Sequence, residues 1–279
     1  MQFKTIFVYM SRRHGCEPLL EAACALARRH EAHLIGAAAF SAVPPVPPLA
    51  IPYSTTVIEE MLRAAQDAEA ELRSAFEETT REQPFVAEWV SVRRLNSDLV
   101  AAVLEHARAA DLIVASQRDP EWDLGPVLDF PERLALESGR PLFIVPRSGR
   151  PSQDIKKIAI AWNGTRESAR AAYDSLPFCI AAENVTILTV TPDASPLAQD
   201  TPADALAAAL ARHDIPTTVT HLQTSNAGVA RTLINEATRQ EADLIVMGAY
   251  GHSRLREFVF GGVTRDMTND SPLPMLMSH

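Results

Sequence analysis

The stretch Asp243-Leu-Ile-Val-Met-Gly248-Ala-Tyr-Gly251-His-Ser-Arg-Leu-Arg-Glu-Phe-Val-Phe-Gly261-Gly262-Val-Thr264 decides the class of fold. It starts with a short apolar run, Leu244–Met247, which is typical of a buried parallel strand. A glycine directly after such a strand allows the backbone to turn at positive φ and lets a ligand approach bare N–H groups. Any one of these glycines alone would only punctuate a turn. Together, between a strand and a helix, they predict an anion-binding loop in an α/β fold.

An internal repeat divides the chain into two copies of one domain. Three matches occur in the same order: Lys4-Thr-Ile-Phe-Val-Tyr-Met with Lys156-Lys-Ile-Ala-Ile-Ala-Trp, Asp111-Leu-Ile-Val with Asp243-Leu-Ile-Val, and, more loosely, Arg140-Pro-Leu-Phe-Ile-Val-Pro with Ser271-Pro-Leu-Pro-Met-Leu-Met. Each copy has the length of a typical domain. We therefore expect domains at residues 1–149 and 150–279, joined at the polar, proline-containing stretch Pro146–Ile155.

The composition is that of an ordinary soluble globular protein, with 47% hydrophobic and 22% charged residues. No apolar run is long enough to span a bilayer and the N-terminus lacks a signal-peptide pattern, so no membrane partner is expected. The net charge of −9 and the lack of a long basic run argue against a nucleic-acid partner, although a local basic patch is left open. Cys16, Cys24 and Cys179 show no CxxC spacing, which predicts buried thiols in a cytoplasmic protein.

Both copies alternate short apolar runs with amphipathic segments, which predicts parallel strands joined by helical crossovers. The expected strands are Ile6–Met10, His33–Ala39, Phe85–Val92, Leu112–Ala115 and Leu142–Val145, then Ile158–Trp162, Val185–Val190, Thr217–Leu222, Leu244–Met247 and Leu273–Met277. The expected helices are Glu17–Arg29, Thr56–Arg81, Asp98–Ala109, Glu167–Ala181, Pro202–Arg212 and Ala227–Arg239, with a further helix start at Gly261–Gly262. The inner face expected for the long helix consists of Val57, Met61, Ala64, Ala68, Leu72 and Ala75.

Several enzyme motifs are absent from the chain. It has no Gly-Lys dipeptide, no G-x-G, no G-x-S-x-G and no H-E-x-x-H, which argues against Walker-type, standard dinucleotide, hydrolase and zinc-protease sites. His252 and Ser253 lie within the glycine loop, and lining a phosphate site is the favoured role, ahead of a plain exposed loop and of catalysis. No catalytic residue and no metal-ligand set is assigned.

The second half resembles the universal stress protein family. The nucleotide-binding branch of that family carries Gly-x2-Gly-x9-Gly followed by Ser or Thr, and Gly248, Gly251 and Gly261 have this spacing. The resemblance covers both halves, but it is specific in the second and weak in the first. It implies an α/β protein with two tandem copies of a five-stranded parallel-sheet, Rossmann-like (adenine nucleotide α-hydrolase-like) domain.

The resemblance also implies a site for ATP, with or without Mg²⁺, or for a related adenine nucleotide. The implied site residues are Ala161, Trp162, Asn163, Val190, Gly248, Gly251, His252, Ser253, Arg254, Gly261, Gly262, Val263 and Thr264. Two of them depart from the family pattern. Gly262 stands at the Ser/Thr position, with Thr264 as a substitute donor, and Asn163 stands where the family has Asp. Asn163 keeps an acceptor oxygen for a ribose or base, but a turn role before Gly164 is an equal alternative.

The first copy is expected to have lost this site. Ser116 and Asp119 stand against Gly248 and Gly251, and residues 117–131 contain four carboxylates and, with Pro131 at the end, three prolines. We therefore expect one nucleotide per chain and a regulatory, non-enzymatic stress-response role. The rivals are a slow ATPase, an interaction scaffold without nucleotide, and a small apolar ligand in the first half. The last strands of the copies, Leu142–Val145 and Leu273–Met277, are expected to pair as an intramolecular pseudo-dimer, and a further homodimer is left open.

Overall fold

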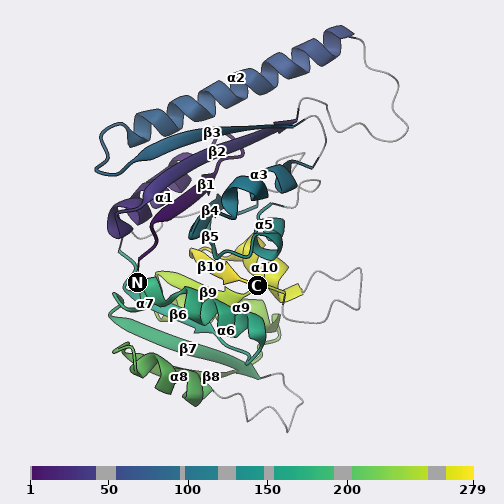
Figure 1. The fold of residues 1–279 in the computed structure, drawn as a ribbon. Helices are drawn as coiled ribbons and strands as arrows, with labels where there is room; N and C mark the ends of the chain where they lie inside the picture. The colour runs from purple at the N-terminus through teal and green to yellow at the C-terminus, as the bar shows by residue number, and fades with distance from the viewer. Residues whose placement is uncertain are drawn as a thin grey trace. The chain divides into compact units, whose positions relative to one another are not determined.

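The computed structural model in Figure 1 describes residues 2–41, 55–94, 98–118, 130–147, 154–191, 203–250 and 262–279. Within these residues the chain forms two compact units. The N-terminal unit is Phe3–Ser138, and the C-terminal unit is Gly139–His279 together with Gln2. The boundary predicted at residues 149 and 150 separates the sequence repeats, and it stays a prediction. The two compact units divide earlier in the chain, between Ser138 and Gly139. They do so because strand β5 (Leu142–Val145) pairs with a strand of the C-terminal unit.

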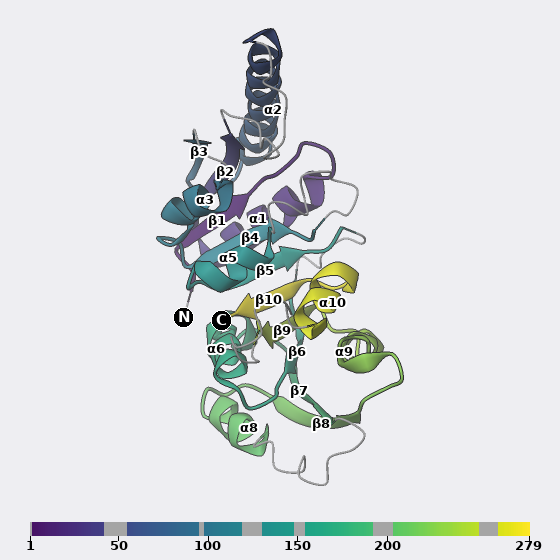
Figure 2. The ribbon, with the colours of Figure 1, turned by 90° about the vertical axis from the view of Figure 1, so that its right-hand side faces the viewer.

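The N-terminal unit is built from strands that alternate with helices. Its described elements are β1 (Thr5–Tyr9), α1 (Glu17–His30), β2 (His33–Ser41), α2 (Thr55–Thr80), β3 (Ala87–Arg94), α3 (Leu99–Ala107), β4 (Leu112–Ser116) and α5 (Glu132–Glu137). The strands pair in parallel in the order β3-β2-β1-β4, with Val8 beside Gly36 and Val114. Helix α1 lies on one side of this sheet, and α3 and α5 lie on the other (Figure 2). The predicted strands of this unit are confirmed, whereas the short helix α5 was not expected.

Helix α2 extends past the sheet that it covers. Leu72 and Ala75 are buried as predicted, and Phe76 packs on Gly36 and on the ring of Trp89, 5.5 Å away. The inner face predicted for the first half of this helix is wrong, because Ala64 and Ala68 are exposed and Met61 is 41% exposed. The physical reason is length. Twenty-six helical residues span about 39 Å, whereas the nine residues of β2 span about 30 Å.

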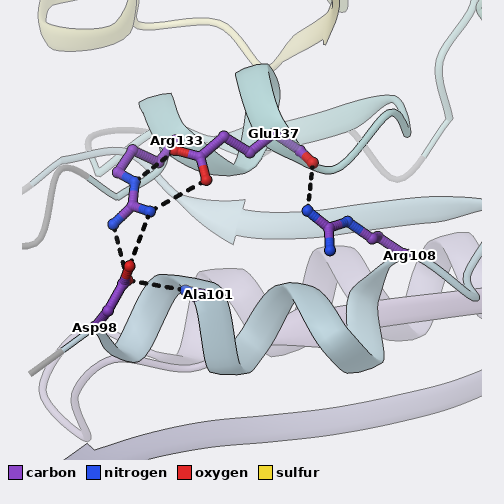
Figure 3. A network of polar contacts seen from close by, with 5 residues as sticks. All are labelled: Asp98, Ala101, Arg108, Arg133 and Glu137. Atoms are coloured by element: carbon purple, nitrogen blue, oxygen red, sulfur yellow. Dashed lines mark hydrogen bonds and ion pairs between the residues drawn. The ribbon is translucent and has the colours of Figure 1, made fainter. Parts of the chain in front are cut away.

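Helices α3 and α5 are joined by the ionic network in Figure 3. Two nitrogens of Arg133 donate to the carboxylate of Asp98 at 2.9 and 3.3 Å, and Arg133 also donates to Glu137 at 2.6 and 3.1 Å. Asp98 caps α3 by accepting the Ala101 N–H at 3.0 Å. Arg133 and this N–H hold the pKa of Asp98 below its ordinary value. Arg108 donates to the Glu137 carbonyl at 3.1 Å, so the α5 segment is fixed on α3 at both ends.

The C-terminal unit repeats the alternation of strands and helices. After β5 its described elements are β6 (Lys157–Ala161), α6 (Arg166–Asp174), α7 (Leu176–Cys179), β7 (Asn184–Thr191), α8 (Ala203–Ala211), β8 (Thr217–Gln223), α9 (Gly228–Arg239), β9 (Leu244–Gly248), α10 (Gly262–Asp270) and β10 (Met275–Ser278). Strands β8-β7-β6-β9-β10 are parallel, and β5 pairs antiparallel with β10 through Phe143 and Leu276. Helices α6 and α8 lie on one side of the sheet, and α9 and α10 lie on the other (Figure 2).

The α/β class with a mostly parallel sheet is therefore confirmed. The helix expected over Glu167–Ala181 is two helices, since α6 ends at Asp174 and α7 begins at Leu176. Pro177 lies in the first turn of α7, where its missing N–H costs nothing, but it could not continue α6. All three cysteines are free and buried, as predicted.

Candidate functional site

At the end of β9, the backbone of helix α6 leaves no space for a side chain on Gly248. A Cβ added to Gly248 would lie 2.5 Å from the carbonyl carbon of Glu167 and from the nitrogen of Ser168, both in the first turn of α6. Glycine is therefore required here for close packing of helix on strand. This differs from the prediction that Gly248 turns the chain at positive φ, because the positive φ belongs to Tyr250, at 58°.

Helix α10 begins at Gly262, as predicted, and its first turn is fixed to the end of β9. The buried hydroxyl oxygen of Thr264 accepts the backbone N–H of Tyr250 at 3.2 Å. Gly262 is exposed, and a Cβ added there would meet no atom within 4 Å. Val263 beside it is 37% exposed. The free N–H groups of this first turn and the helix dipole form a ready site for an anion such as phosphate.

The loop after β6 is held in a turn by the side chain of Asn163. Its side-chain oxygen accepts two hydrogen bonds from Thr165, from the backbone nitrogen at 3.2 Å and from the hydroxyl at 2.9 Å. Gly164 follows at φ 73°, and Thr165 caps α6 by accepting the Ser168 N–H at 3.4 Å. The Asn163 oxygen therefore serves the turn, which was one of the two predicted roles. Its amide nitrogen remains as a hydrogen-bond donor on an exposed side chain.

Three adjacent strands present the remaining predicted residues at their carboxyl ends. Ala161 lies beside Leu188 of β7 and Met247 of β9 in the sheet register. Ala161, Trp162 and Val190 are all half-buried. Figure 1 shows β7, β6 and β9 side by side in the C-terminal unit. The predicted loop residues Gly251, His252, Ser253, Arg254 and Gly261 lie outside the described residues.

Two buried donors at this edge have no hydrogen-bond partner among the residues that the structure describes. They are the indole nitrogen of Trp162 and the hydroxyl of Ser278, which is 1% exposed. Ser278 lies opposite Gly248 in the register of β10 and β9. An unpaired buried donor costs about 1–3 kcal/mol, so such groups are expected where a ligand or water completes the bonding. The family resemblance pointed to Trp162, but nothing in the sequence singled out Ser278.

A second group that sequence reasoning missed is Glu167, in the first turn of α6. Its side chain is 10% exposed and accepts from Arg166 at 3.1 Å. Burial raises the pKa of this carboxyl, but hydrogen bonds from its own backbone, Thr165 and Arg166 outweigh it, and the pKa is lowered. The carboxylate is therefore charged and neutralised locally by Arg166. Among the described residues, no group of three or more His, Cys, Asp or Glu side chains is arranged to hold a metal ion.

The family model of the universal stress proteins matches residues 154–279, the part of the chain that contains every predicted site residue. Residues 154–279 are a universal stress protein domain. No curated protein sequence matches the chain. None of the described helices is both long and apolar enough to cross a membrane.

Solved structures extend the same fold to the whole chain. A universal stress protein from Archaeoglobus fulgidus DSM 4304 matches at 14% identity with a TM-score of 0.68, covering 98% of this chain and 95% of that chain. A putative universal stress protein from Pseudomonas aeruginosa UCBPP-PA14 matches at 16% identity and TM-score 0.60, covering 99% and 93%. A universal stress protein in complex with cAMP covers 53% of this chain and 100% of its own, at 20% identity and TM-score 0.38. The first two likenesses show a mixed α/β, mostly parallel-sheet fold of the universal-stress type over the whole chain.

The N-terminal unit has a different arrangement at the corresponding strand end. The repeat aligns Tyr9 with Ala161, and Phe130 follows Asp111 by the same 19 positions by which Gly262 follows Asp243. The rings of Tyr9 and Phe130 are stacked with centroids 4.3 Å apart and planes 18° apart, and burial raises the pKa of Tyr9. In the N-terminal unit, two aromatic side chains thus occupy the strand-end positions that Ala161 and Gly262 hold in the universal stress domain.

Proposed function

We propose that the universal stress domain binds ATP, or a related adenine nucleotide, at the carboxyl ends of β6, β7 and β9. The carrying observation is the hydrogen bond from Tyr250 N–H to Thr264, which fixes the N-terminus of α10 beside the end of β9. This arrangement directs the N–H groups of Gly262, Val263 and Thr264 at a phosphate. The resemblance of the glycine spacing to the nucleotide-binding branch of the family supports the same ligand.

The described residues fit the rest of a nucleotide. The Asn163 amide nitrogen and the Trp162 indole N–H are donors for ribose or base acceptors, and Val190 offers apolar surface. Glu167 is the buried carboxylate among the described residues at this edge, and Arg166 offsets its charge. A Mg²⁺ ion, if bound, would be held mainly by phosphate oxygens.

We propose a regulatory, non-enzymatic role in which occupancy of the site is the signal, in a protein of the cytoplasm. A slow ATPase is the rival. It predicts sustained phosphate release from ATP with Mg²⁺, at a rate that falls in the variants that lose binding. A scaffold without nucleotide is the second rival, and it predicts no heat of binding for ATP, ADP or AMP.

Calorimetric titration of the full chain with ATP tests the proposal. We expect saturation near one equivalent, because only the C-terminal unit keeps the site. Gly251→Val should abolish binding, because a β-branched side chain blocks the close approach that the glycine spacing predicts. Two equivalents, or unchanged affinity in Gly251→Val, would contradict the proposal.

A matched pair of substitutions at Gly262 tests the α10 end of the site. Gly262→Phe imports the aromatic side chain of the N-terminal unit and should weaken ATP binding at least about 100-fold, with the fold intact, because a Cβ there meets no atom within 4 Å. Gly262→Ser restores the hydroxyl of the family pattern and should strengthen binding by about fivefold, one added hydrogen bond. Equal affinities for the two variants would show that phosphate is held elsewhere.

We also propose that the two repeats form the intramolecular pseudo-dimer expected from sequence. The antiparallel pairing of β5 with β10 supports it, because β5 is the last strand of the first repeat and β10 the last of the second. Leu142→Pro should weaken this pairing and destabilise β10, which hydrogen exchange at Met275–Ser278 would report.

A further inference from the structure

Strand β8 is an open edge of the sheet of the C-terminal unit. Within the described part of the chain, β8 pairs with β7 alone and stands at the end of the strand order. The Val185 N–H donates to the Pro216 carbonyl at 2.9 Å, and the Thr224 N–H donates to the Thr191 carbonyl at 3.1 Å. Because backbone groups alternate sides along a strand, the even-numbered residues of β8 bond to β7. The odd-numbered residues Thr217, Val219, His221 and Gln223 therefore direct their N–H and C=O groups away from the sheet.

This edge lacks the features that normally keep sheet edges apart. Its sequence, Thr-Thr-Val-Thr-His-Leu-Gln, contains no Asp, Glu, Lys or Arg, no proline and no glycine, and four of its seven residues are β-branched. The edge strand of the N-terminal unit, β3, is different. It carries Glu88, which lies 3.6 Å from His33, and Arg93, which pairs with Glu69 at 3.0 Å. Charged side chains on an edge strand oppose pairing with another chain, and only β3 has them.

We propose that β8 pairs with β8 of a second copy of this chain, antiparallel and about a twofold axis at Thr220. In that register Val219 faces His221 of the other copy, and Thr217 faces Gln223. All four are outward-directed residues, so every pair exchanges two backbone hydrogen bonds. Four N–H groups from each of two chains then give eight hydrogen bonds.

Self-pairing is favoured over a different partner by the charge of the molecule and the symmetry of the strand. Each chain carries a net charge of −9, so two copies repel each other. This electrostatic repulsion is smallest when the copies meet through an edge that has no charged side chain. The outward groups are placed symmetrically about Thr220, as an isologous contact requires. A single strand pair is a small interface, so we expect a dissociation constant on the order of micromolar.

Cysteine cross-linking on the full chain gives a sharp test, since the native thiols are all buried. In the proposed register Thr220 faces Thr220 of the second copy as a non-hydrogen-bonded pair. The two Cα atoms are then about 4.5 Å apart, which is within the range that a disulfide spans. Thr220→Cys should therefore form a covalent dimer under mild oxidation. Thr218→Cys is the matched control. Thr218 lies on the same strand face and is more exposed, yet its symmetry mate is roughly 13 Å away along the strand.

Sedimentation of the proline variant tests the backbone bonds. Val219→Pro removes an outward N–H while leaving the bonds to β7 intact, so it should raise the dimer dissociation constant at least about tenfold. If Val219→Pro does not fold, Val219→Lys places a charge on the edge and should have the same effect. A chain that is monomeric at every concentration, equal cross-linking of Thr218→Cys and Thr220→Cys, or dimerisation unchanged by a folded Val219 variant would each overturn the proposal.

Discussion

The two repeats use the same strand end in opposite ways. In the C-terminal unit, small residues stand at these positions, with Ala161 at the end of β6 and Gly262 at the start of α10. In the N-terminal unit, the aligned positions hold Tyr9 and Phe130, whose stacked rings fill the space. The parallel strand order is the same in both. One scaffold thus carries the proposed ligand site in one copy and a packed pair of rings in the other, and the difference depends on two side chains more than on the fold.

The helices that follow this strand end, α5 and α10, also differ in the polar contacts that attach them to the neighbouring helix. In the N-terminal unit α5 is held on α3 by Arg133, which reaches both Asp98 and Glu137 (Figure 3). In the C-terminal unit, α9 and α10 pack on each other, and the ion pair seen between their described residues is a long one of 3.5 Å, between Arg231 and Asp270, both about half exposed. The ionic contact on α10 is therefore weaker than the network on α5, although the Tyr250–Thr264 hydrogen bond fixes the first turn of α10. Four changes test this comparison, and they are ordered by expected effect.

Phe130→Ala should have the largest effect, because it removes a buried ring from the filled strand end. We expect the N-terminal unit to lose about 3 kcal/mol or more of its free energy of unfolding. Hydrogen exchange of β1 and β4 peptides measures the loss within that unit. Phe130→Leu is the control and should cost clearly less. If Phe130→Ala is as stable as the parent chain, the stacked pair does not hold the edge closed.

Acid should destabilise the N-terminal unit before the C-terminal unit. Burial, with the nearby charges of Arg29 and Lys4, lowers the pKa of His30 from 6.5 to about 4. The unfolded chain therefore binds a proton that the folded chain does not. The stability that neutral His30 gives is full above pH 6.5, and about 3 kcal/mol is lost between pH 6.5 and pH 4.

His30→Phe keeps a ring against Phe3, whose centroid lies 4.9 Å from that of His30, and it removes the titration. Unfolding of the two units followed at pH 7 and pH 4.5 should show a smaller difference in this variant. An unchanged pH dependence would assign the acid sensitivity to other groups.

Exchanging the residues at the ends of β9 and β4 should lower the free energy of unfolding clearly in the C-terminal unit and only slightly in the N-terminal unit. Gly248→Ser forces a Cβ to within 2.5 Å of the α6 backbone, and we expect a loss of about 2 kcal/mol. Ser116→Gly makes the reverse change at the half-buried end of β4 and should cost less than about 1 kcal/mol. Denaturant unfolding of the two variants gives both values. Similar costs would mean that Gly248 is not set by packing on α6.

Arg133→Met should give the smallest effect of the four, about 1 kcal/mol, because the network is partly exposed to solvent. The pKa of Asp98 is lowered by Arg133, so this contribution is present above about pH 4 and is lost as the pH falls below it. Arg231→Met is the counterpart in the other unit and should cost under about 0.5 kcal/mol. Equal costs at pH 7 would remove the proposed difference in how α5 and α10 are fixed.

The elements that were predicted correctly depend on neighbours along the chain. Apolar runs such as Leu112–Ala115 and Leu244–Met247 are β4 and β9, and Thr165 and Asp98 are the caps of α6 and α3. Side-chain periodicity and capping act over a few residues, so they can be read from sequence. The same local signal predicted that α10 begins at Gly262, which is where we propose that phosphate binds.

What only the tertiary structure decided are contacts between residues far apart in the chain. Gly248 is a glycine because α6 packs on it, and the stacking of Tyr9 with Phe130 joins residues more than a hundred positions apart. The sequence by itself determined the tandem α/β repeat and which half keeps the glycine spacing. The tertiary structure decided that the Asn163 oxygen is used by its own turn. Within the described part of the chain, it also decided that Trp162 and Ser278 are unpaired donors and that β8 is an open edge. Local pattern sets which elements form, whereas the packing of those elements sets which polar groups remain free for a partner.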